Sequence, residues 1–192
     1  MYLQQKSPSF LAGAVWPQHS LLRDVIFVLA GSWLIALTAQ LSFTIGPVPI
    51  TGQTFGVLLV GALLGSRRGA ASVLAYLAQG FAGLPVFAGG AATTAVLAGP
   101  TAGYLLGFLP AALVVGWLCE RGWDRRVETA VIAMLLGNLI IYAFGLPLLS
   151  RFVGWDQVLQ LGLIPFIPGD ILKVLLAAIL MPSGWKLLQR FQ

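Results

Sequence analysis

The stretch Ile167-Pro168-Gly169-Asp170-Ile171-Leu172-Lys173-Val174-Leu175 places two charged side chains inside a long apolar run near the C-terminus. An ionisable side chain within a membrane helix costs roughly 2.5–3.5 kcal/mol on insertion scales, so its presence needs a reason. The spacing of Asp170 and Lys173 puts both on one face of a helix. Pro168-Gly169 mark a helix start, where backbone N–H groups are unpaired. We interpret this stretch as part of a polar pocket; an ion pair that only holds helices together is the alternative.

The composition of the chain is that of a polytopic membrane protein. Its 192 residues are 58% hydrophobic and only 9% charged, with a mean hydropathy of +0.91, whereas soluble domains carry about 25% charged residues. This length allows about six helices of about 20 residues. We therefore predict an all-α fold with six transmembrane helices, formed by one membrane domain over residues 22–192. Residues 1–21 lack the long apolar segment of a secretory signal and are predicted to be a short N-terminal tail.

Prolines, glycines and basic residues divide the apolar sequence into six predicted spans. These spans cover about residues 24–43, 51–65, 69–81, 100–118, 127–149 and 168–188. A glycine-rich connection, residues 84–94, precedes the fourth span, and Pro110 is expected to kink it. Small residues four positions apart allow close packing of helices, which we expect at Gly52/Gly56, Gly61/Gly65 and Gly103/Gly107.

The basic residues fall on one side of the membrane when alternate connections are assigned to opposite sides. Cytoplasmic connections of membrane proteins carry an excess of Lys and Arg, so both termini are predicted to be cytoplasmic. Arg151 is then left on the outer side and Lys173 within a helix. Nine of the eleven Lys and Arg residues share the cytoplasmic side: Lys6, Arg23, Arg67, Arg68, Arg121, Arg125, Arg126, Lys186 and Arg190. The connections at 47–49, 84–94 and 165–170 lie outside, so the pocket opens outward.

Several kinds of chemistry are absent from the sequence. There is no phosphate-binding loop of the Gly-x-x-x-x-Gly-Lys-Ser/Thr type, no His-Glu-x-x-His zinc motif and no Gly-x-Ser-x-Gly nucleophile motif. The single Cys119 cannot form an intrachain disulfide, and His19 has no second histidine with which to bind a metal. We therefore expect no cofactor and no metal, and we favour binding or transport over catalysis.

Four separated motifs occur in order and together resemble one family. They are Gly46-Pro47-Val48-Pro49-Ile50-Thr51-Gly52-Gln53-Thr54, Gly83-Leu84-Pro85-Val86-Phe87-Ala88-Gly89-Gly90, Gly99-Pro100-Thr101-Ala102-Gly103-Tyr104-Leu105-Leu106-Gly107-Phe108 and Pro165-Phe166-Ile167-Pro168-Gly169-Asp170-Ile171-Leu172-Lys173. The chain resembles BioY, the biotin-specific substrate-binding subunit (S component) of energy-coupling factor (ECF) transporters, over about residues 24–190. This resemblance implies a protein of the bacterial cytoplasmic membrane that captures biotin from outside, together with a transmembrane coupling subunit (T component) and a pair of ABC ATPases.

Biotin has three chemically different parts, and the resemblance therefore implies a particular partner for each charged residue. Its ureido ring carries two N–H donors and one carbonyl acceptor, its body is apolar and its tail ends in a carboxylate. The Asp170 carboxylate suits the ureido N–H groups. Lys173 and the exposed helix N-terminus suit an acceptor, either the ureido oxygen or the tail.

Neutral residues complete the expected site. Gln53 and Thr51 begin the second span on the outer side and can supply polar contacts, while Phe87 and Tyr104 can enclose the apolar body of the ligand. Packing or helix capping is the alternative for these four. Gly89-Gly90 would let the outer connection move as a lid, or would form a plain flexible connection.

Two further features are left open by the sequence. Asn138 lies in the middle of the fifth span, where it either faces the pocket or forms a hydrogen bond across helices, and Tyr142 is equally open. Some family members carry a polar or charged residue after the Gly-Gly pair, where this chain has Ala91-Ala92-Thr93-Thr94. This departure leaves open whether that connection holds the ligand.

The resemblance also implies a contact with the coupling subunit through the first helix. Related proteins carry a small-residue Ala-x-x-x-Ala pair there, and the corresponding residues here are Ser32 and Ala36. Serine is still small enough for close helix packing. Three other functions compete with biotin capture: an S component for another vitamin, a membrane-embedded lipid-modifying enzyme and a purely structural partner subunit.

Overall fold

The computed structural model describes residues 10–16, 20–92 and 94–189, so that Lys6, His19, Thr93 and Arg190 lie outside the described residues. The helices are α1 Leu11–Val15, α2 Leu21–Gln40, α3 Gln53–Phe81, α4 Ala102–Cys119, α5 Val127–Val153, α6 Trp155–Gly162 and α7 Ile167–Gln189. Short 3-10 helices are η1 Ala88–Gly90, η2 Thr94–Ala98, η3 Trp123–Arg125 and η4 Ile164–Phe166, and the strands β1 Ser42–Phe43 and β2 Ile50–Thr51 pair antiparallel. Five helical stretches of the described chain are long and apolar enough to cross a membrane, which confirms the predicted class of polytopic all-α membrane protein.

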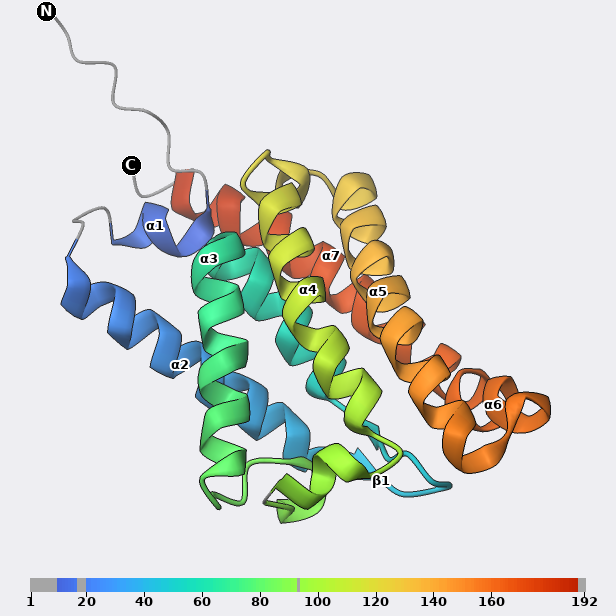
Figure 1. Ribbon diagram of the computed structural model, residues 1–192. Helices are drawn as coiled ribbons and strands as arrows, with labels where there is room; N and C mark the ends of the chain where they lie inside the picture. Colours follow the sequence, from blue (N-terminus) through green and yellow to red (C-terminus); the bar gives the residue numbers. More distant parts are fainter. Residues whose placement is uncertain (1–9, 17–19, 93, 190–192) are drawn as a thin grey trace, which may run out of the picture.

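Helix α3 doubles back on itself at Gly65. The backbone of Gly65 has φ 80° and ψ 177°, which is not helical. A Cβ placed on Gly69 would lie 2.8 Å from the Cα of Gly61, although a straight helix would separate these residues by about 12 Å. Residues 53–64, the first limb, and residues 66–81, the second limb, therefore run side by side in opposite directions (Figure 1). The reversal falls where the sequence separates the second and third spans, while the count of six membrane crossings stays a prediction.

Glu120 stabilises the reversal from the C-terminal end of α4. Its Oε1 accepts hydrogen bonds from the backbone N–H of Ser66 at 2.8 Å and from the Ser66 hydroxyl at 3.0 Å. The first N–H groups of a helix have no partner within the helix, and a carboxylate at that end is also favoured by the helix dipole. One side chain thus caps the second limb of α3 and joins it to α4.

The predicted glycine pairs lie where helices approach most closely. A Cβ on Gly56 would lie 2.3 Å from a hydroxyl of α2, and one on Gly61 would lie 2.8 Å from a backbone carbonyl of α4. A Cβ on Gly103 would lie 2.4 Å from a backbone carbonyl of α5. Real Cβ atoms do not come this close to their neighbours, so these glycines allow α2, α3, α4 and α5 to pack backbone to backbone.

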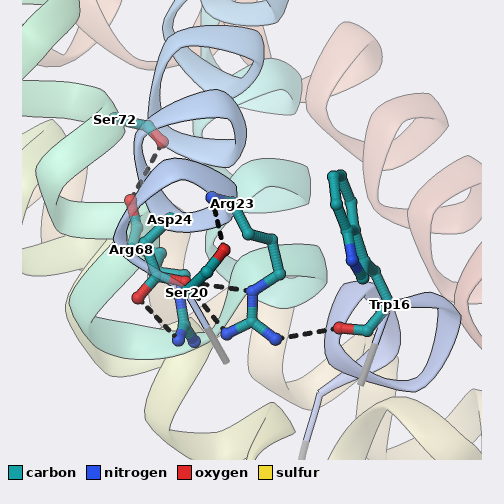
Figure 2. A network of polar contacts seen from close by, with 6 residues as sticks. All are labelled: Trp16, Ser20, Arg23, Asp24, Arg68 and Ser72. Atoms are coloured by element: carbon teal, nitrogen blue, oxygen red, sulfur yellow. Dashed lines mark hydrogen bonds and ion pairs between the residues drawn. The ribbon is translucent and has the colours of Figure 1, made fainter. Parts of the chain in front are cut away.

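A charged network joins the N-terminal helices to the second limb of α3 (Figure 2). Asp24 of α2 accepts hydrogen bonds from Arg68 at 2.8 and 3.0 Å and forms an ion pair with the fully buried Arg23 at 2.9 Å. Arg23 also donates to the backbone carbonyl of Trp16 at 2.8 Å. The tail predicted for residues 1–21 is therefore partly a packed helix, since α1 contacts α3 and α7 and the buried Phe10 ring lies beneath the Arg68 guanidinium.

The bundle has two chemically different ends. One end holds α1, the reversal of α3, η3 and the end of α7, and the other holds β1, β2, η1 and α6 (Figure 1). At the first end, the indole N–H of Trp185 donates to the buried carboxylate of Asp124 at 2.5 Å, and burial raises the pKa of Asp124. Arg125 lies over the Trp185 ring at 4.8 Å. The basic residues of the described chain gather here, except for Arg151 and Lys173, while the assignment of this end to the cytoplasm stays a prediction.

Replacement of Gly65 tests the reversal of α3. We expect Gly65→Ala to destabilise the protein by about 1–3 kcal/mol, because this backbone conformation is nearly restricted to glycine and the new Cβ would lie 2.5 Å from Glu120 Oε1. Thermal unfolding in detergent measures the effect. Gly46→Ala is the matched control, since a Cβ there meets nothing within 4 Å. Equal unfolding midpoints for the two variants would contradict the account.

Candidate functional site

A cavity of about 320 Å³ lies at the end of the bundle that carries β1 and β2. Its walls come from the connection that contains β2, the start of α3, the connection before α4, and α4, α5 and α7. The volume falls at the lower end of the range of small-molecule sites, about 300–1,000 Å³. Five of the residues predicted from the sequence line this cavity: Thr51, Gln53, Phe87, Tyr104 and Lys173.

Asp170 and Lys173 form an ion pair in the first turns of α7, as in the alternative that the sequence left open, and they do so beside the cavity. Lys173 Nζ donates to Asp170 Oδ1 at 3.2 Å and to Thr54 Oγ1 at 3.0 Å. The Tyr142 hydroxyl donates to the other carboxylate oxygen of Asp170. The side chains of Lys173 and Asp170 are only 17% and 10% exposed. Lys173, Thr54 and Tyr142 line the cavity, and Asp170 lies against them as the shared hydrogen-bond partner of Lys173 and Tyr142.

Thr51 and Gln53 combine capping with lining of the cavity. The Thr51 hydroxyl accepts the backbone N–H of Gln53 at 3.1 Å and donates to Gln53 Oε1 at 3.0 Å. Gln53 Nε2 in turn donates to the Tyr76 hydroxyl at 2.5 Å. These bonds fix the amide of Gln53 at the first residue of α3. Thr51 and Gln53 therefore take part in capping the start of α3 and also line the cavity.

The aromatic wall on one side of the cavity is formed by Phe87. Its ring packs edge-to-face on Tyr76 with a centroid distance of 5.4 Å. It also lies directly over Gly80, where a Cβ would approach Phe87 Cζ to 2.1 Å. The absence of a side chain at Gly80 therefore determines how far Phe87 withdraws from the cavity.

A second aromatic group forms the opposite wall. The Tyr104 ring is stacked against Phe166 and perpendicular to Tyr142, each with a centroid distance of 6.2 Å. Its hydroxyl donates to the backbone carbonyl of Gly162 at 2.8 Å. Tyr104 thus presents its apolar ring to the cavity, while its hydroxyl is hydrogen-bonded to the last residue of α6.

The glycine-rich connection lines the cavity with residues that flank its glycine pair and not with the glycines themselves. Gly89 and Gly90 have φ of 65° and 74°, a conformation that glycine adopts without strain, but neither lines the cavity. The flanking Ala88 and Ala91 do line it. The Gln40 side chain at the end of α2 donates to the Phe87 carbonyl at 3.2 Å, which holds this connection in place. A lid movement at Gly89-Gly90 stays a prediction.

Asn138 lies apart from the main cavity. With Thr54 and Lys173 it lines a separate void of about 10 Å³, which is about large enough for one water molecule. Its Oδ1 is buried and has no hydrogen-bond partner among the described residues. Asn138 is not among the residues that line the main cavity, and a role in ligand binding stays a prediction. Thr54 was not predicted as a site residue, although it ends the Gly46–Thr54 motif and its hydroxyl accepts a hydrogen bond from Lys173.

The predicted coupling face of the first helix lies inside the bundle. Ser32 is fully buried, its hydroxyl donates to the Leu29 carbonyl at 2.8 Å and it accepts from Gln79 of α3 at 3.2 Å. Ala36 is 4% exposed. Both residues are therefore packed within the bundle, and their contact with a coupling subunit stays a prediction. Small residues allow close approach to any helix, and here the second limb of α3 occupies that position.

Comparison with known proteins places the chain among membrane transporters. A sequence profile of the BioY family matches residues 8–190. The chain belongs to the BioY family. It is 39% identical to the "Biotin transporter BioY" of Rhizobium etli over 82% of this chain and 90% of that protein. It is 40% identical to the "Probable biotin transporter BioY" of Pyrococcus horikoshii over 82% of this chain and 93% of that protein.

A solved structure shares the fold of this BioY protein. The S component for biotin from an ECF-type ABC transporter superposes with a TM-score of 0.77 and is 26% identical. The match covers 88% of this chain and 95% of that protein. The helical arrangement described above is therefore that of a substrate-binding subunit from this transporter class.

The unliganded protein tests whether Asp170 and Lys173 act as a coupled pair. We expect Lys173→Met to lower the free energy of unfolding by about 1–3 kcal/mol, because the buried carboxylate loses a partner. The double variant Asp170→Asn/Lys173→Met should recover most of that loss, since a neutral pair needs no compensating charge. Thermal unfolding in detergent without ligand measures both. A single variant as stable as the parent would show that the pair is not coupled.

Proposed function

We propose that this protein captures biotin from outside the cytoplasmic membrane as the S component of an ECF-type transporter. The observation that carries the proposal is the Asp170–Lys173 pair beside a cavity whose other lining residues are uncharged. Its family membership supports the choice of ligand, because several relatives are named biotin transporters. These relatives are transporters, and we propose no catalytic reaction.

The chemistry of the pair matches the ureido ring of biotin. The ring presents N–H donors beside a carbonyl acceptor, and the pair presents a carboxylate acceptor beside an ammonium donor 3.2 Å away. Hydrogen bonds to ionised groups are about twice as strong as neutral ones. Tyr142 and Thr54, which line the cavity with Lys173, hold the two charged groups through hydrogen bonds, so the pair is oriented before the ligand arrives. The ring walls of Phe87 and Tyr104 suit the apolar body of biotin.

ATP-driven uptake requires partner subunits, because the chain has no phosphate-binding loop with which to bind ATP. We propose that a T component and a pair of ABC ATPases supply the coupling, as the resemblance to an S component of an ECF-type transporter suggests. The basic end of the bundle faces the cytoplasm in this arrangement, in keeping with the excess of Lys and Arg there. The cavity then opens on the opposite side.

Binding of radiolabelled biotin to the purified protein tests the function. We expect saturable binding in detergent that unlabelled biotin displaces and that thiamine and riboflavin do not displace. Displacement by one of the other vitamins would instead support an S component for that vitamin. Absence of binding by all three would contradict the proposal and favour a lipid-modifying or structural role.

Asp170 can be tested individually by calorimetric titration with biotin. We expect Asp170→Asn to weaken binding by roughly ten- to hundredfold, because the amide presents one donor where the carboxylate presents two acceptors and because a charge-assisted bond contributes about 1.5–3 kcal/mol. Asp156→Asn is the matched control, since Asp156 is an exposed carboxylate of α6 that does not line the cavity. An unchanged affinity of Asp170→Asn would remove Asp170 from the site.

A further inference from the structure

The half of the bundle that holds the cavity contains few charged side chains. The sequence has no Asp, Glu, Lys, Arg or His between Val25 and Ser66 or between Gly69 and Cys119. These stretches supply most of the cavity wall, and Lys173 is the one charged residue among the described residues that line it. The outer charges of Arg151 and Asp156 are exposed on α5 and α6 and do not line the cavity.

Lys173 lies at the inner end of the cavity, with Asp170 as its ion-pair partner. Lys173 and Thr54 line both the main cavity and the small void beside Met134 and Asn138, which lie further along α5 toward the basic end than the cavity-lining Tyr142. The two connections that carry Pro47 and Ala91 line the cavity at the end of the bundle that holds β2 and η1. A ligand therefore meets one charged end and one neutral rim.

We propose, resting on the proposed function, that this protein recognises biotin through the ureido ring and not through the charge of the carboxylate. With the ureido ring at Asp170 and Lys173, the tail extends to the neutral rim. The polar groups available there are neutral, such as the Thr101 hydroxyl in front of α4. A neutral hydroxyl can donate a hydrogen bond to the carbonyl oxygen of an amide or ester, as it can to a carboxylate oxygen. The ligand class therefore includes neutral carboxyl derivatives of biotin.

Binding in the opposite orientation, with the carboxylate at Lys173, predicts a different affinity for neutral derivatives of biotin. If the carboxylate paired with Lys173, a neutral derivative would lose a charge-assisted bond and bind roughly ten- to hundredfold more weakly. With the carboxylate at the rim, loss of its charge changes affinity by less than about fivefold, the range of exposed ion pairs. Biotin amide is the sharpest probe because it has nearly the same shape as biotin and no charge.

Calorimetric titration of the purified full-length protein with biotin, biotin amide and biotin methyl ester tests the inference. We expect both neutral derivatives to bind within about fivefold of biotin, and a diamine analogue without the ureido carbonyl to bind far more weakly. Biotin binding with a loss of more than about tenfold for the amide would overturn the inference and leave the proposed function intact. Failure of biotin itself to bind would instead refute the proposed function.

A cation placed at the rim provides a second, independent test. Ala91 is exposed and lines the cavity, so Ala91→Arg should create a preference for biotin over its amide of roughly tenfold. Ala91→Gln is the matched control, because it adds length and polarity without charge. An unchanged ratio of biotin to amide affinity in Ala91→Arg, with biotin still bound, would place the tail elsewhere and overturn the inference.

Discussion

The ion pair between Asp170 and Lys173 is the interaction on which the site depends. Two charges placed among apolar helices are unfavourable unless each has partners, and the fold supplies them from two further helices. Tyr142 of α5 donates to the carboxylate and Thr54 of α3 accepts from the ammonium. Three helices that are far apart in the sequence are thereby required to meet at one end of the bundle. Lys173, Thr54 and Tyr142 of this cluster also line the cavity, so the same contacts place polar groups where a ligand can reach them.

Close backbone packing provides the rigid surroundings that this arrangement needs. The reversal of α3 at Gly65 places its two limbs against each other, and the capping bond from Glu120 joins the second limb to α4. That second limb carries Tyr76 and Gly80, which set the positions of Gln53 and Phe87 at the cavity. The charged end of the bundle and the cavity are therefore connected through one helix. Substitutions at the reversal act on the site through the position of this limb.

The sequence predicted the helical membrane class, the charged pair and five lining residues, because charge inside an apolar run and motif order are local signals. Thr54 and the exact partners of Asp170 were not predictable, since they depend on how distant helices meet. Two positions stayed open for Asn138, facing the pocket or facing a neighbouring helix, because a polar residue within a span is expected to be buried but the sequence does not show which side it faces. The packing of Ser32 and Ala36 against α3 was not predictable, because small residues indicate close packing but not the identity of the neighbouring helix. The packed α1 was missed because a short apolar segment has no distinctive pattern.

The most direct measurement is an experimental structure of the protein with biotin bound. The account predicts that the ureido nitrogens lie within about 2.7–3.2 Å of the Asp170 carboxylate, that the ureido oxygen faces Lys173 and that the carboxylate lies at the rim near Ala91 and Thr101. A ligand with its carboxylate on Lys173 and its ureido ring at the rim would contradict the assignment of the site. A ligand bound outside this cavity would contradict the account as a whole.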